Sequence, residues 1–283
     1  SDLVILAGRP SMGKTALATN IAFAIARSHR RGPKPDGTEG TVEGGVVGFF
    51  SLEMSAEQLA ARILSEASGI PSDRIRRGDL TWEEFRRFAE AARELEACPL
   101  YIDDTPAIPI AQLAARARRL KRTHGLDVLF VDYLQLIRPA TMRDSRVNEV
   151  SEITQALKAI AKELDIPVVA LSQLSRQVES RDDKRPQLSD LRDSGSIEQD
   201  ADVVMFVFRE EYYREREKPS EDNLDAMAKW QAAMEAVHGK AEVVIGKQRH
   251  GPIGTVDLAF DGKLTRFSNL VRNWQKGAED GLR

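Results

Sequence analysis

The sequence GRPSMGKT occupies residues 8–15, directly after the apolar run LVILA at 3–7. Gly8 is separated from Gly13 by four residues, and an alanine-rich helical pattern follows at 16–27. A strand, a turn of this spacing and a helix together form a P-loop. Its glycines let backbone N–H groups surround phosphates, and the helix N-terminus adds partial positive charge. We therefore predict a nucleoside triphosphate site at the start of the chain.

Two side chains of this P-loop have predicted chemical roles. Lys14 is expected to bind the β- and γ-phosphates, and the Thr15 hydroxyl is expected to ligate Mg²⁺. The alternative is an ordinary glycine-rich turn with an exposed lysine. The predicted nucleotide-binding residues are Gly8, Arg9, Pro10, Ser11, Met12, Gly13, Lys14, Thr15 and Ala16.

Three further polar residues follow apolar runs that have the character of buried strands. Asp132 ends VLFVD and is a candidate to hold Mg²⁺ through its water shell, although aspartate also ends strands for reasons of turn formation. Glu53 follows FFSL and is a candidate general base, or else a helix-start glutamate favoured by the macrodipole. Gln173 is expected to contact the γ-phosphate, or else to be a plain polar loop residue. Because parallel strands share their carboxyl edge, we expect all three to meet the P-loop there.

The rest of the chain alternates strand and helix patterns, which predicts an α/β domain with a mostly parallel twisted sheet flanked by helices. An antiparallel hairpin at 241–249 and 253–260 is expected to close one sheet edge. Three capping boxes mark helix starts, at Ser55–Gln58, Thr81–Glu84 and Ser196–Gln199. Strands are expected at 3–7, 46–51, 99–102, 127–132, 167–172 and 202–208, and helices at 14–29, 55–68, 82–97, 109–123, 147–164 and 226–237.

Composition favours one soluble domain over 1–283, with 42% hydrophobic and 30% charged residues. No apolar run is long enough to predict a membrane span, and the single cysteine, Cys98, fits a reducing, cytoplasmic setting. The net charge of −3 indicates that any nucleic-acid site is local or built by several subunits. We expect a mobile surface loop at 30–45 and a charged, partly helical insertion at 209–240.

Six motifs together resemble the RecA-like motor domain of the DnaB-family replicative helicases. They are GRPSMGKT, FFSLEMS, VLFVDYLQL, ALSQLSR, LRDSGSIEQDADVV and GKQRHGPIG, and they occur in the family's order over about 4–260. The resemblance implies ATP and Mg²⁺ as ligands and a homo-hexameric ring, joined through its ATP sites, that moves on single-stranded DNA during replication. It also implies primase and helicase-loader partners for a full-length member. Family members carry an N-terminal domain and a linker helix, so we expect this chain to be the motor without them.

The resemblance assigns catalytic roles to Lys14, Glu53 and Gln173, and implies that Lys247 and Arg249 reach into a neighbouring subunit's ATP site. A guanidinium supplied in trans can stabilise charge on the transferring phosphoryl group. The alternative is a pair of exposed basic residues that protect an edge hairpin.

For DNA, the resemblance implies a central-channel loop at 175–193. Arg192, Asp193 and Gly195 match the family's DNA-contacting positions. No aromatic residue lies in this loop, so we expect contacts mainly to the DNA backbone. Its basic residues are balanced by acidic ones, which leaves a solvated, salt-bridged loop as the alternative.

Two other functions remain open at this stage. One is a different RecA-like ATPase, such as a recombination or repair factor. The other is a nucleotide switch that does not translocate.

Overall fold

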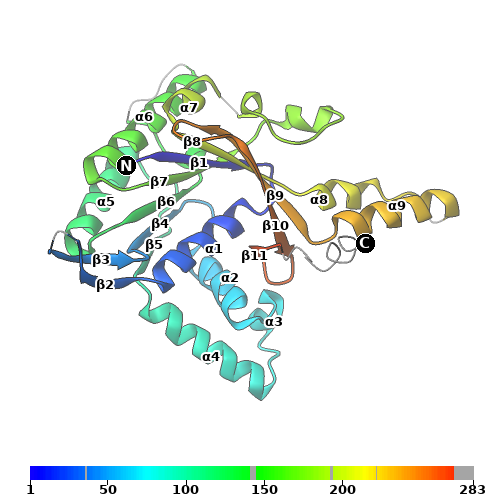
Figure 1. Cartoon of the computed structure of the whole chain (residues 1–283), viewed down its shortest axis with the longest axis horizontal. Helices are drawn as coiled ribbons and strands as arrows, with labels where there is room; N and C mark the ends of the chain where they lie inside the picture. Colours follow the sequence, from blue (N-terminus) through cyan, green and yellow to red (C-terminus); the bar gives the residue numbers. More distant parts are fainter. Residues whose placement is uncertain (36, 141–144, 192–193, 221, 271–283) are drawn as a thin grey trace, which may run out of the picture.

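The computed structural model describes residues 1–270 apart from 36, 141–144, 192–193 and 221. A nine-stranded sheet in the order β11-β10-β9-β8-β1-β7-β6-β4-β5 runs through the molecule (Figure 1). Six of its strands are parallel, which confirms the predicted α/β class. They are β1 (Leu3–Gly8), β4 (Val47–Ser51), β5 (Leu100–Asp103), β6 (Val128–Asp132), β7 (Val168–Gln173) and β8 (Val203–Phe208).

Helices cover both faces of this sheet. Helices α1 (Lys14–Arg27) and α2 (Ala56–Ser68) pack on one face, around a core that includes Phe49 and Phe130. Helices α5 (Ile110–His124), α6 (Arg146–Leu164) and α7 (Ser194–Asp200) pack on the other. Strands buried on both faces explain the continuous apolar runs in the sequence.

An antiparallel ribbon extends the sheet beyond β8. It consists of β9 (Lys240–Gln248), β10 (Gly254–Asp261) and β11 (Arg266–Asn269). The predicted hairpin is therefore correct, and β11 adds a strand that the sequence did not predict. Phe260 of β10 and Phe267 of β11 join the core beneath α1, so the ribbon is packed against the start of the first helix.

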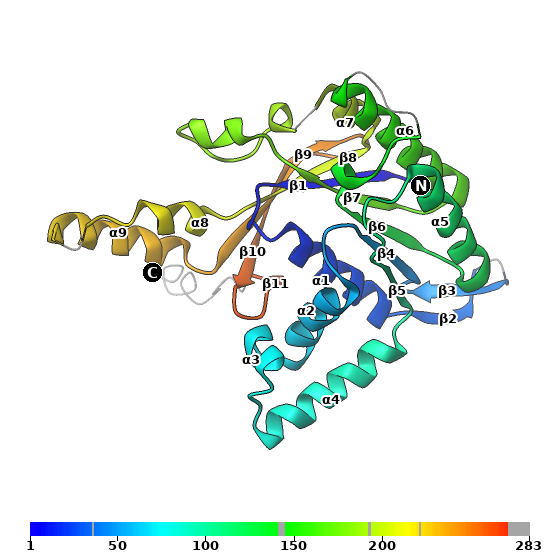
Figure 2. The same cartoon turned by 180° about the vertical axis from the view of Figure 1, so that it is seen from behind.

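Two segments project from this body. Helix α4 (Trp82–Ala97) extends beside the short α3 (Ser72–Arg77). Helices α8 (Glu210–Arg214) and α9 (Leu224–Val237) form an arm on the side of the molecule opposite α5 (Figures 1 and 2). Trp230 of α9 donates a hydrogen bond from its indole nitrogen to the carbonyl of Arg214 at 2.7 Å. The helix predicted at 226–237 corresponds to α9.

Two local expectations need correction. The segment 30–45 contains paired strands, β2 (Arg30–Pro33) and β3 (Glu39–Glu43). The hairpin is tied to the body because the Thr41 hydroxyl donates to Asp127 at 3.0 Å. The predicted cap at Ser196 is wrong, since α7 begins two residues earlier and Ser196 lies within it. The capping boxes at Ser55 and Thr81 are both formed, with each hydroxyl accepting from the N3 backbone N–H. No helix among the described residues is long and apolar enough to cross a membrane.

Candidate active site

A pocket of about 740 Å³ lies at the carboxyl edge of the parallel strands. The expected convergence occurs there, because Glu53, Asp132 and Gln173 line the pocket together with the P-loop. Six of the nine predicted nucleotide-binding residues also line it, namely Pro10, Ser11, Gly13, Lys14, Thr15 and Ala16. The Met12 side chain is buried in the core instead, and the Arg9 side chain hydrogen-bonds to Glu179.

The P-loop requires glycine at its turn into α1. Gly13 has a φ of 95°, and a Cβ added there would stand 2.9 Å from the ring of Phe267. Left-handed backbone and close approach both exclude a side chain. The Lys14 ammonium folds back to donate to the Gly8 carbonyl at 3.0 Å, which holds it over the loop.

The predicted metal ligands are adjacent. The Thr15 hydroxyl donates to Oδ2 of Asp132 at 2.7 Å, and Asp132 pairs in register with Ser51 of the next strand. Mg²⁺ prefers oxygen ligands and is commonly held by one or two carboxylates together with substrate phosphates. Thr15 and Asp132 fit this requirement, since both present oxygen atoms beside the phosphate loop.

Burial and mutual attraction set the charges in the pocket. Burial lowers the pKa of Lys14, while the nearby Asp132 and Glu53 oppose that shift. Burial also raises the pKa of Asp132, against the hydrogen bond from Thr15 and the charge of Lys14. The pocket therefore holds desolvated groups of both charges, whose mutual attraction opposes the effect of burial on each.

Sequence reasoning missed Arg62, which also lines the pocket. Burial lowers the pKa of its guanidinium, and Asp132 and Glu53 oppose the shift. It stands two turns after the Ser55 cap, so the helix geometry of α2 carries it to the same place as Glu53. The sequence signal that could have identified it is an arginine nine residues after Glu53, within the helix predicted at 55–68.

Gln173 is positioned by a second glutamine that sequence reasoning also missed. Gln173 pairs in register with Gly8 of β1. The Gln135 side chain accepts from the Gln173 backbone N–H at 3.3 Å and donates to the Ser172 hydroxyl at 3.0 Å. Gln135 thereby links the segment after β6 to the end of β7, directly beside the P-loop.

Lys247 and Arg249 are absent from this pocket's lining among the described residues. Both lie where β9 ends, at the edge of the sheet where the parallel strands begin. Gln248, which stands between them in the sequence, pairs with Val203 of β8, and Val203 pairs with Val4 of β1. The Lys247 ammonium donates to the Glu198 carbonyl, and Arg249 lies 3.3 Å from Asp202. Neither residue can reach the pocket of its own chain.

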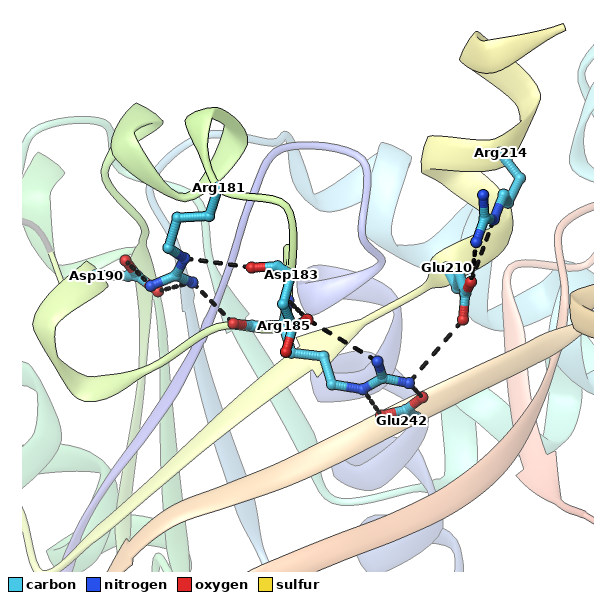
Figure 3. A network of polar contacts seen from close by, with 7 residues as sticks. All are labelled: Arg181, Asp183, Arg185, Asp190, Glu210, Arg214 and Glu242. Carbon is cyan, nitrogen blue, oxygen red and sulfur yellow. Dashed lines mark hydrogen bonds and ion pairs between the residues drawn. The ribbon is translucent and has the colours of Figure 1, made fainter.

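The segment 174–191 is fastened by ion pairs (Figure 3). Arg181 contacts the buried Asp190 at 2.8 Å, and Arg185 contacts Glu242 of β9 at 2.8 Å. Basic residues of this segment are thus partly neutralised by acidic residues of the same chain. Arg192 and Asp193 lie outside the described residues. Gly195 stands in the first turn of α7, where an added Cβ would meet no described atom within 4 Å.

The P-loop after the first strand, the oxygen ligands beside it and the mostly parallel sheet define a RecA-like P-loop NTPase fold. The RadB recombinase shares this fold at 14% identity and a TM-score of 0.50, over 95% of this chain and 91% of that one. A model of the DnaB-like helicase C-terminal domain matches residues 1–269, and the chain belongs to that family.

Individual relatives agree with this assignment. The replicative DNA helicase DnaB of Rickettsia bellii is 54% identical over 273 residues, which are 95% of this chain and 54% of that protein. A solved DnaB-like replicative helicase, described with its interactions with primase, has a TM-score of 0.79 and 38% identity over 95% of this chain and 57% of that chain. The ATPase domain of G40P has a TM-score of 0.78 and 38% identity, over 95% of this chain and 85% of that one. The chain spans about half the length of the curated relatives it matches.

Proposed function

We propose that this chain is the motor domain of a replicative DNA helicase. It hydrolyses ATP at contacts between the subunits of a hexameric ring, and the ring moves along single-stranded DNA. One observation carries the proposal: Lys14, Glu53 and Asp132 share one pocket, whereas Lys247 and Arg249 lie at the opposite edge of the same sheet. A basic pair so placed is remote from the pocket of its own chain, which supports its donation to the pocket of another copy.

The predicted catalytic and metal-binding residues each have a task in this proposal. Lys14 binds the β- and γ-phosphates, and Thr15 and Asp132 hold Mg²⁺, which neutralises phosphate charge when bound. Glu53 accepts a proton from the attacking water. Gln173 contacts the γ-phosphate and transmits its loss to the 174–191 segment. Arg249, supplied by the adjacent subunit with Lys247, stabilises charge on the transferring phosphoryl group.

The DNA contacts are proposed for Arg192, Asp193 and Gly195 at the end of the channel loop. Gly195 supports this role because it has no side chain of its own to keep a phosphate away from its backbone N–H. Primase and helicase-loader contacts belong to the proposal for the full-length protein, and one similar structure is described with primase.

The test combines two inactive variants. Lys14→Ala removes the phosphate contact, and Arg249→Ala removes the donated guanidinium. We expect each variant alone to have little ATPase activity and their mixture to recover part of it, because some interfaces then join an intact pocket to an intact Arg249. A mixture as inactive as its components contradicts donation between copies.

The DNA arm of the test measures ATPase rate against the length of single-stranded DNA at several protein concentrations. A translocating motor is expected to be stimulated more by longer strands. A rate independent of DNA favours a nucleotide switch. Strand exchange without unwinding of a forked duplex favours a recombination factor.

A further inference from the structure

Asp202 is a buried carboxylate at the sheet edge that carries Arg249. It stands directly before β8, and 4% of its side chain is exposed. Its Oδ2 accepts a hydrogen bond from the Leu3 N–H at 2.8 Å and contacts the Lys158 ammonium of α6. Its Oδ1 lies 3.3 Å from Nη1 of Arg249. One carboxylate therefore joins the start of β1, helix α6 and the residue that follows β9.

The Asp202 carboxylate is charged despite its burial. Burial acts to raise its pKa, but the contacts with Lys158, the Leu3 N–H and Arg249 outweigh burial, so the pKa lies below its ordinary value. Attraction between opposite charges is stronger away from water. The carboxylate can therefore hold the Arg249 guanidinium in one direction.

Arg249 is held at its backbone and left open at its side chain. Its N–H donates to the Asp202 carbonyl at 2.8 Å, which continues the pairing of β9 with β8. About half of the side chain, 48%, is exposed, so a group from another molecule can reach it. Lys247, the other member of the basic pair, donates to the carbonyl of Glu198. The segment 198–202 thus holds both basic residues.

We propose that Asp202 is a positioning residue for ATP hydrolysis, which directs Arg249 toward the ATP site of the adjacent subunit. The inference rests on the proposed donation of Arg249 between copies and adds the group that orients the guanidinium. An arginine side chain has many rotamers, and fixing one in advance reduces the entropy lost when it meets its target. Lys158 has a different task, because it contacts the other oxygen of the carboxylate and leaves Oδ1 to Arg249.

The variant Asp202→Asn separates these contacts. The Leu3 N–H and Lys158 are both donors to Oδ2, so the amide oxygen of asparagine is expected to take that place. The amide nitrogen then replaces Oδ1 and turns a donor toward Arg249, which can only donate. We expect ATPase turnover to fall about tenfold, since a misplacement of about 1 Å can cost up to about a hundredfold. ATP affinity from calorimetry is expected to stay unchanged, because Asp202 lies outside the described lining of its own chain's pocket.

Mixing experiments test whether the defect lies in the donated group. Asp202→Asn mixed with Lys14→Ala is expected to recover part of the turnover, because Lys14→Ala supplies a correctly held Arg249 to an intact pocket. Asp202→Asn mixed with Arg249→Ala is expected to show no recovery, because neither chain supplies one. Damage to the fold or to the pocket of Asp202→Asn would not produce this difference between the two mixtures.

Lys158→Met is the matched control, since it removes the other cation beside Asp202 and leaves Oδ1 unaltered. It is expected to keep its turnover, and thermal unfolding checks that each variant is folded. Asp202→Ser, whose hydroxyl can still accept from the Leu3 N–H, replaces Asp202→Asn if that variant does not fold, with the same expected results.

Three results overturn the positioning role and leave donation by Arg249 intact. They are full turnover in Asp202→Asn, an equal loss in Lys158→Met, and equal behaviour of the two mixtures. Full turnover in Arg249→Ala overturns the donation itself and this inference with it.

Discussion

Arg9 of the P-loop and Glu179 of the segment after β7 form an ion pair, with 2.7 Å between Nη2 and Oε1. Arg9 also donates from Nε to Glu179 at 2.9 Å and from Nη1 to the Leu174 carbonyl at 3.0 Å. The arginine is buried, with 8% of its surface exposed. The loop that surrounds phosphates is thus tied directly to the segment that leads toward the proposed DNA contacts, independently of Gln173.

Glu179→Gln is expected to weaken the coupling between the P-loop and the 174–191 segment. Its amide keeps a hydrogen-bond acceptor but loses the charge, so the P-loop itself stays formed and ATP affinity changes little. We expect stimulation of ATPase by single-stranded DNA to fall about fivefold, a coupling of about 1 kcal/mol. Asp182→Asn, an exposed change in the same segment, serves as the control. Equal stimulation of ATPase by DNA in Glu179→Gln and Asp182→Asn contradicts the proposed coupling through Glu179.

Glu53→Gln is expected to separate binding from hydrolysis. The amide occupies the same volume in the pocket but accepts a proton far less readily than the carboxylate. Loss of a general base lowers turnover by about 10²–10⁴-fold. ATP affinity from calorimetry and turnover from phosphate release are measured on one preparation. Turnover close to that of the unaltered protein removes Glu53 from the role of base.

ATP affinity is expected to fall at alkaline pH because of Lys14. Burial lowers its pKa below the ordinary range of lysine, so the ammonium is lost earlier as the pH rises. Bound phosphates favour the ammonium, and binding above the lowered pKa must take up a proton. The affinity then falls by at most about tenfold per pH unit. Calorimetry in two buffers of different ionisation enthalpy measures the proton taken up when ATP binds at alkaline pH. Binding without proton uptake contradicts this prediction.

Ser55→Ala is expected to lower stability through the start of α2. The Ser55 hydroxyl accepts from the Gln58 N–H, and the Gln58 side chain accepts from the Ser55 N–H. Loss of such a cap costs about 1 kcal/mol. Chemical unfolding measures the change in the free energy of unfolding, and Ser55→Asp, which can still cap, is expected to retain stability. A stability loss of the same size in Ser55→Asp assigns the effect to something other than capping.

The elements that were predictable are those whose signals are local. The strand that precedes the P-loop, the capping boxes of α2 and α4, and the apolar runs that end at Glu53, Asp132 and Gln173 each depend on nearby residues. Parallel pairing then brings these ends to one edge, so most of the pocket followed from the pattern. DNA contacts, subunit contacts and the catalytic roles stay predictions.

Some of the missed features depend on contacts between distant parts of the chain, and others are local. Arg209 and Thr265 also line the pocket. Arg209 reaches it only because β8 lies beside β1, and Thr265 only because β11 folds back over α1. The wrong cap at Ser196 had a correct local motif, but α7 begins earlier, at Ser194. The hairpin at 30–45 carries almost no apolar signal, so composition could not distinguish it from a loop.

The β9–β10 hairpin has its two ends at opposite edges of the sheet, with Phe260 at the nucleotide pocket and Lys247 at the far side. If each pocket is completed by the basic pair of another copy, as proposed, a head-to-tail arrangement repeats the same contact from one copy to the next. Such an arrangement closes only by returning to its first member. A closed ring then leaves no pocket without a basic pair, whereas an open chain leaves one such pocket at its end.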